Sequence, residues 1–255
     1  MTDIKITYNC EISDKTKEKM SRALMYGGIE KISEGLDITG LSEIIFSSNI
    51  KSIKESDIDC HINGEMEVLS SDPPNYRIWV YIFNNQKIDN WLNTIRHEMA
   101  HVHDRNKIIS LYLFCESCGD SNDVYKKFYP LVIRTWSEFY ATYRSNIYSN
   151  IDNVNAKIVF MNSVLDEIEK MEKQESTYKK QELIVFISRF IGEIISTDYS
   201  QEGNKKIISN TKHDIVIRRL YDELDCLKDS YPVWNDESVF NGLYQILVDF
   251  LCENY

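Results

Sequence analysis

Residues 87–107 read KIDNWLNTIRHEMAHVHDRNK, and the periodicity of this stretch decides the fold around it. Large apolar side chains recur along it about every 3.6 residues, which predicts a helix with one packed face. The members of this apolar stripe are Ile88, Trp91, Leu92, Ile95, Met99 and Val102. The preceding residues, 76–83, alternate with a period of two and predict a strand whose two faces both meet apolar groups. The chain therefore changes from strand to helix near residue 87.

Two histidines on this helix are spaced for metal binding. The residues from His97 to His101 read HEMAH and match the pattern HExxH. At 100° per residue both histidines lie opposite the apolar stripe, and one helical turn separates them. Both imidazoles can then reach one zinc ion at about 2.0 to 2.1 Å, while Glu98 lies at the flank and can act as a catalytic base. The alternative is a pair of surface histidines on a solvated helix face.

Two polar residues follow the motif on the same helix. Asp104 returns to the histidine face one turn later, where it can orient His101 as a hydrogen-bonding carboxylate or bind the metal itself. His103 points toward the edge of the apolar side. We expect a structural role for His103, whether packed or exposed, rather than metal binding.

A catalytic zinc ion held by two histidines needs one more protein ligand. Glu138 is the candidate, because it lies in the next long predicted helix among small side chains that let this helix approach the HExxH helix closely. These small neighbours are Thr135, Ala141, Thr142 and Ser145. Glu116, Asp104 and acidic residues further along the chain are the competing candidates.

Strand patterns dominate the chain before residue 87, and helical patterns dominate after residue 120. Strands are expected at 3–11, 44–50 and 76–83, with a hairpin turn at Asn63-Gly64 and a helix within 14–36. Further helices are expected at about 122–149, 154–174, 178–198, 212–229 and 236–253. The predicted fold class is α+β: a small N-terminal mixed or antiparallel sheet with helices, the HExxH helix, and a mainly helical C-terminal bundle. We expect a core domain over 1–150 and a helical subdomain over 151–255.

Composition limits the partners and the location of the protein. A net charge of −11 argues against nucleic acid, since binding a phosphate backbone usually needs a basic face. No run reaches the roughly 18 apolar residues of a membrane span, and the first residues contain no apolar leader, so we expect a cytoplasmic protein. Its six cysteines are then reduced. Cys115 and Cys118 lack two further zinc ligands at matching spacing, and we interpret them as ordinary thiols.

At His97, Glu98, His101 and Glu138 the chain resembles the gluzincin metallopeptidases, in which a glutamate on a later helix completes HExxH. Among bacterial members it is most similar to the ImmA/IrrE type of regulatory peptidase, over residues 76–148. The resemblance implies a zincin-like fold with His97, His101 and Glu138 as zinc ligands and Glu98 as the base. This chain departs from several gluzincins because no acidic residue follows Glu138 by four positions.

The expected activity is hydrolysis of peptide bonds in a peptide or protein substrate, by a metal-activated water with Glu98 as general base. Tyr140, Tyr143 and His213 are candidates for stabilising the negative charge of the intermediate, although each is more often structural. The strand at 76–83 can be a platform for an extended substrate or simply a core strand. Two alternatives remain: a zinc-binding regulatory or scaffold module with little or no turnover, and a zinc hydrolase of a non-peptide amide.

Overall fold

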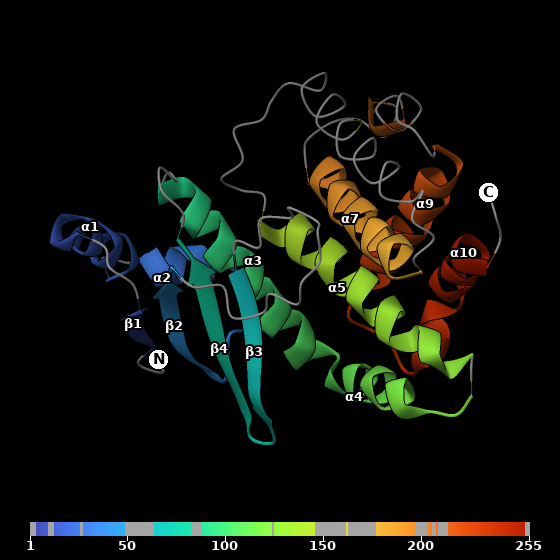
Figure 1. Ribbon diagram of the computed structural model, residues 1–255, viewed down its shortest axis with the longest axis horizontal. Coiled ribbons are helices and arrows are strands. Elements are labelled where there is room, and N and C mark those ends of the chain that lie inside the picture. The colour runs from blue at the N-terminus through green and yellow to red at the C-terminus, as the bar shows by residue number, and fades with distance from the viewer. Residues whose placement is uncertain are drawn as a thin grey trace. The chain divides into compact units, whose positions relative to one another are not determined.

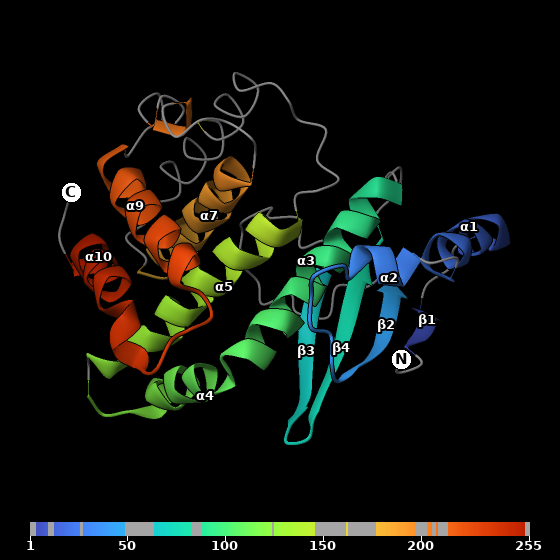
Figure 2. The ribbon, with the colours of Figure 1, turned by 180° about the vertical axis from the view of Figure 1, so that it is seen from behind.

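The computed structural model describes residues 4–9, 13–25, 28–48, 64–82, 88–123, 125–145, 162, 177–196, 203–205, 208 and 214–252 (Figures 1 and 2). The chain divides into two units, Met1–Asn106 and Lys107–Tyr255, and each is described by itself. The class is α+β, with one four-stranded sheet and a majority of helices among the described residues. The predicted helix at 154–174 lies outside the described residues except for residue 162. Residue 63 of the predicted hairpin turn at Asn63-Gly64 also lies outside them, whereas Gly64 begins a strand.

The first unit is built on a mixed sheet with the strand order β1-β2-β4-β3. β1 (Lys5–Asn9), β2 (Leu41–Ser47) and β4 (Pro74–Tyr81) run parallel, and β3 (Gly64–Ser71) pairs antiparallel with β4. The β3–β4 hairpin turns at Asp72-Pro73. The strongest predicted strand, β4, is therefore an interior strand with hydrogen-bonded neighbours on both sides. This position excludes β4 as an edge platform for a substrate, and the simpler expectation of a core strand holds.

One face of the sheet forms the core of the first unit with three helices. These helices are α1 (Asp14–Met25), α2 (Gly28–Ile32) and α3 (Ile88–Lys107), and Figure 2 shows α2 and α3 in front of the strands. The strands contribute buried aliphatic and aromatic side chains at alternate positions, including Ile44, Phe46, Ile78 and Val80. The helix α3 contributes Trp91, Ile95, Met99 and Val102, so the predicted apolar stripe does pack into the core.

The other face of the sheet carries charged and polar groups beside apolar ones, since buried Ile45 of β2 is the register partner of Trp79 on this face. Trp79 and Tyr81 point to this face, but the Trp79 indole donates to Glu67 at 2.8 Å and the Tyr81 hydroxyl donates to Glu65 at 3.0 Å. Glu43 accepts hydrogen bonds from Thr7 at 2.6 Å and from Arg77 at 3.0 Å. The Thr7 hydrogen bond is the main reason why the pKa of Glu43 lies below its ordinary value.

The second unit is helical in its described part. It contains α4 (Ile109–Ser117), α5 (Tyr129–Ser145), α7 (Thr177–Ile195), α9 (Asp214–Ser230) and α10 (Asn241–Cys252), with short 3-10 turns at Cys118–Asp120, Lys126–Phe128 and Glu237–Phe240. The sequence did not predict α4, and the helix expected from about residue 122 begins at Tyr129. None of the described helices has the length and apolar character needed to cross a membrane.

The centre of the second unit is a cluster of aromatic rings. The fully buried ring of Trp136 lies 4.7 Å from the ring of Trp234 and 5.6 Å from those of Tyr140 and Tyr231, measured between centroids. Tyr140 and Tyr231 are themselves 4.6 Å apart. Such ring pairs add to the free energy of burial, so this cluster is a main source of stability for the second unit.

The helices α5 and α7 approach each other closely at Gly192. A Cβ atom at this position would lie 2.5 Å from the Phe139 carbonyl oxygen and 3.0 Å from the Tyr143 amide nitrogen. A second link is Arg134, whose guanidinium donates to both carboxylate oxygens of Glu182 at 2.6 and 2.9 Å. The contacts advance in the same direction along both helices, which therefore run parallel.

This close approach predicts that Gly192→Ala destabilises the protein, although alanine favours a helix by about 1 kcal/mol over glycine. The added methyl group meets backbone atoms that cannot rotate away, so we expect the free energy of unfolding in urea to fall by about 1–3 kcal/mol. Gly119→Ala is the control, because its Cβ would lie at an ordinary 3.5 Å from Pro130 Cγ. A Gly192→Ala protein at least as stable as the wild type would contradict the packing described here.

Candidate metal centre

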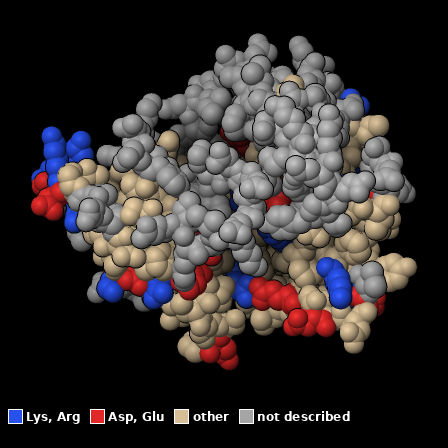
Figure 3. Space-filling view, in the orientation of Figure 1, with Lys and Arg blue, Asp and Glu red and all other residues tan. Residues whose placement is uncertain are grey.

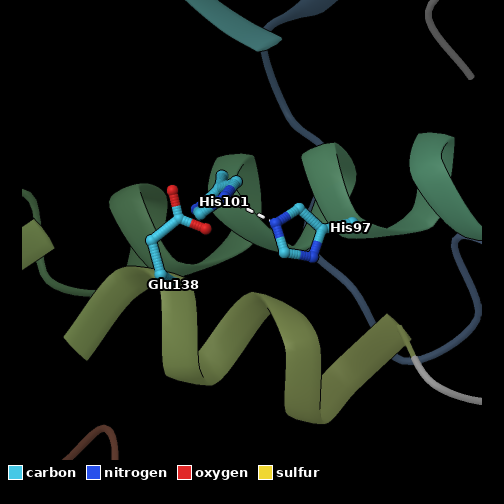
Figure 4. A group of neighbouring side chains, drawn as sticks. All are labelled: His97, His101 and Glu138. Carbon is cyan, nitrogen blue, oxygen red and sulfur yellow. Dashed lines mark hydrogen bonds between the residues drawn. The ribbon is translucent and has the colours of Figure 1, made fainter. Parts of the chain in front are cut away.

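The histidine pair on α3 has the geometry of two ligands of one ion. The Nε2 atoms of His97 and His101 lie 3.2 Å apart, and the two rings meet at 83° (Figure 4). Two nitrogens bound at about 2.05 Å in a tetrahedral zinc site are separated by ~3.3 Å. The observed separation matches this value, so the predicted spacing on the helix does bring the two imidazoles together.

Burial of the pair is unequal. The His101 side chain is almost completely buried, while His97 is partly exposed. The opposite side of α3 is packed against the sheet through Ile95 and Met99. The rotation of the helix that buries its apolar stripe therefore also presents both imidazoles away from that stripe.

Glu98 lies against the first residue of β3. Its side chain is only 5 % exposed. A Cβ atom built at Gly64 would lie 3.0 Å from Glu98 Oε1 and 2.6 Å from Thr94 Cγ2. Glycine at position 64 thus leaves the space in which the Glu98 carboxylate sits, next to the histidine pair on the same helix.

Polar contacts anchor α3 to the segment before β2. Buried Arg96 donates to the Ile32 carbonyl and, at 3.2 Å, to the Glu34 carbonyl. His103 is also buried, and its Nδ1 accepts a hydrogen bond from the Asp37 amide at 2.6 Å. His103 is therefore a structural histidine, as predicted.

Asn106 extends this anchor at the end of the helix. Its amide donates to the carbonyl groups of Asp37 and Thr39 at 3.2 and 2.9 Å, and its Oδ1 accepts from the Tyr76 hydroxyl at 2.9 Å. These bonds tie α3 both to the connection before β2 and to strand β4. They fix the helix that carries the motif.

The carboxylate of Asp104 is completely buried on α3, three residues after His101. Burial of a carboxylate requires compensating polar contacts, which suits a group that orients a neighbour. Its predicted role beside His101 stays a prediction.

Glu138 lies on α5 and is joined to α7 by an ion pair. Its Oε2 accepts from Arg189 Nε at 2.8 Å, and its side chain is 14 % exposed against 46 % for Arg189. Its small neighbours Thr135, Ala141 and Ser145 are buried. Thr142, another of these small neighbours, lies against Gly192 of α7. The expected approach of α5 to the HExxH helix stays a prediction.

The predicted ligands come from both units: His97 and His101 lie on α3 of the first unit, and Glu138 lies on α5 of the second (Figure 4). Of the competing candidates, Glu116 is exposed on α4 and Asp104 is buried on α3. Glu138 stays the predicted third ligand.

Cys115 and Cys118 are both buried and form no disulfide. Burial raises the pKa of the Cys115 thiol to about 12, so this group stays protonated at neutral pH. The interpretation of the pair as ordinary thiols stays a prediction.

Tyr140 and Tyr143, the candidates for stabilising an intermediate, both make packing contacts. The Tyr140 ring is buried in the aromatic cluster, and Tyr143 stacks on Phe139 while the Lys228 ammonium lies 5.9 Å from its centroid. These contacts give both rings a structural role, and a catalytic role stays a prediction. His213 lies outside the described residues.

Sequence reasoning missed Gly64 and Arg189. No pattern could have found either one, because Gly64 precedes Glu98 by 34 positions and Arg189 follows Glu138 by 51. Only the strand order and the pairing of α5 with α7 bring them to these carboxylates.

Lys and Arg side chains are interspersed with Asp and Glu on the face drawn in Figure 3, with no broad basic patch among the coloured residues.

The hydrogen bond from Asp37 predicts that His103→Ala lowers the free energy of unfolding by about 1–3 kcal/mol, because a partly buried amide loses its acceptor. Zinc stoichiometry, measured by mass spectrometry of the metal, should stay at the wild-type value. His103→Asn places an oxygen acceptor near the lost Nδ1 and should recover part of the stability. Loss of zinc from a folded His103→Ala protein would instead make His103 a ligand.

Comparison of the chain with protein-family models, with curated proteins and with solved structures finds no match in any of the three. The case for a metal centre therefore rests on the residues themselves. Its strongest elements are the 3.2 Å separation of the two imidazole nitrogens and the carboxylate of Glu98 beside them.

Proposed function

We propose that this protein is a zinc-dependent hydrolase of peptide bonds with a zincin-like core, acting in the cytoplasm. His97, His101 and Glu138 hold the zinc ion in this proposal, and Glu98 is the general base. The observation that carries it is the histidine pair, whose Nε2 atoms lie at the separation of two tetrahedral ligands. Imidazole nitrogens and a carboxylate oxygen are also the donors that catalytic zinc commonly takes.

When it is bound, zinc supplies Lewis acidity, which polarises a carbonyl group and makes a water molecule nucleophilic near neutral pH. Glu98 takes the proton of the attacking water and passes it to the leaving amine. Its position suits this task, since the nearly buried carboxylate is held between α3 and the start of β3. His97 and His101 orient the reacting centre through a helix that is fixed at several points.

The number of ligands favours catalysis over a purely structural site. Structural zinc sites usually have four protein ligands, whereas catalytic sites have three and keep one position open. The proposed ligand set of His97, His101 and Glu138 has three members. A scaffold module would also gain nothing from a carboxylate placed beside the ligand pair.

A peptide is favoured over a small amide by the position of β3. This strand is at the edge of the sheet, and its first residue, Gly64, is next to Glu98. An edge strand offers backbone donors and acceptors to an extended peptide, which would add to the sheet antiparallel or parallel to β3. The strand that we propose to bind the substrate is therefore β3, and not β4, the strand expected from the sequence.

The decisive experiment compares Glu98→Gln with His97→Ala and His101→Ala. Purified wild-type protein supplied with zinc should bind one equivalent and hydrolyse a pool of fluorogenic random-sequence peptides. Glu98→Gln should keep the zinc and lose hydrolysis by a factor of about 100 or more, because the base contributes 10²–10⁴-fold. The histidine variants should lose both.

Glu116→Gln is the matched control, since it makes the same chemical change at an exposed position on α4. It should leave zinc binding and hydrolysis unchanged. Wild-type protein that binds no supplied zinc would overturn the proposal. Zinc binding without any hydrolysis of the pool would favour the scaffold alternative.

The space at Gly64 generates a second prediction for this function. Gly64→Ala should displace the Glu98 carboxylate or Thr94 and lower hydrolysis about 10- to 100-fold, because small misplacements of catalytic groups have effects of this size. Bound zinc should remain at one equivalent. Gly119→Ala is again the control, and full activity in Gly64→Ala would contradict the placement of Glu98.

A further inference from the structure

Arg189 contacts the proposed metal ligand Glu138. The Nε atom of its guanidinium donates to Glu138 Oε2 at 2.8 Å. The carboxylate is the more buried partner, with 14 % of its side chain exposed against 46 % for Arg189. A hydrogen bond between two charged groups is shorter and stronger than one between neutral groups, so this contact restricts the rotation of the carboxylate.

The helix that carries Arg189 is itself held in place. Gly192, three residues later on α7, lies against the backbone of α5 near Phe139 and Tyr143. Arg134 and Glu182 join the same two helices through two hydrogen bonds. Arg189 therefore reaches Glu138 from a rigid neighbour, which is the condition under which a supporting contact can fix a ligand.

We propose that Arg189 is a positioning residue for the metal ligand Glu138, an inference that rests on the proposed function. The hydrogen bond to Oε2 restrains the orientation of the Glu138 carboxylate. A partner that fixes the orientation of a metal-binding carboxylate raises its affinity for the ion.

Loss of Arg189 has two opposing effects on zinc affinity. Removal of a positive charge reduces repulsion of the ion and strengthens binding, whereas loss of the orienting hydrogen bond weakens it. The guanidinium is nearly half exposed, so solvent screens the first effect. Loss of a partner that orients a ligand typically weakens metal binding 10- to 100-fold, and we expect this second effect to dominate.

The test measures zinc affinity by competition with a chromophoric chelator, and the geometry of the bound ligands by the absorption spectrum of the cobalt-substituted protein. The variants are Arg189→Met, which keeps the aliphatic stem, and Arg189→Lys, which keeps a charge and one donor. Arg134→Met is the matched control, because Arg134 joins the same two helices, has the same 46 % exposure and does not contact Glu138.

Arg189→Met should bind zinc about 10- to 100-fold more weakly and change the cobalt spectrum, because the Glu138 carboxylate loses its restraint, while Arg189→Lys recovers part of the affinity. Arg134→Met should keep wild-type affinity and spectrum. If Arg189→Met and Arg134→Met lost zinc affinity equally, the loss would come from weaker packing of α7 on α5, and the inference would be overturned. Unchanged or tighter zinc binding in Arg189→Met would overturn it as well. Failure of the wild-type protein to bind zinc is a separate outcome, which rejects the proposed function and the inference together.

Discussion

The rotation of α3 about its own axis is the constraint on which the candidate metal centre depends. Four large side chains of the helix are buried against the sheet, and burial of each contributes roughly 1.5–3 kcal/mol. A rotation by one residue, or 100°, would expose them, which makes the observed orientation strongly preferred. Arg96 and His103 add polar contacts on the flanks of the same helix. Because the apolar stripe is buried in the core, the imidazoles on the opposite side of the helix face away from the core.

This dependence explains why the sequence could predict the histidine pair. A spacing of four residues on a helix brings two side chains together without any information about the rest of the fold. The apolar stripe of α3 and the alternation in β4 are local patterns as well, and both elements are found where these patterns predict them. The structural role of His103 followed from its angle relative to the stripe. Glu138, in contrast, was selected by its surroundings and by a family resemblance.

The features that sequence could not predict depend on contacts between distant segments. The order of strands in a sheet is non-local, so the apolar pattern of 76–83 fits an interior strand and an edge platform equally well. The helix α4 has apolar residues on all sides of its first two turns, which gives no amphipathic pattern to detect. Gly64 and Arg189 matter only through the atoms they lie against.

Helix geometry also explains why the proposed site cannot be built from α3 alone. The next position on the histidine face, Asp104, lies seven residues after His97, about 10 Å further along the helix axis. An ion bound at about 2 Å by both histidines lies beside the turn that joins them, and the Asp104 carboxylate is too far along the axis to reach it. A third ligand has to come from another element, and its carboxylate then lacks the fixed spacing that orients the imidazoles. In our proposal the ion pair between Arg189 and Glu138 supplies that missing restraint, and it forms where α7 lies close to α5 at Gly192.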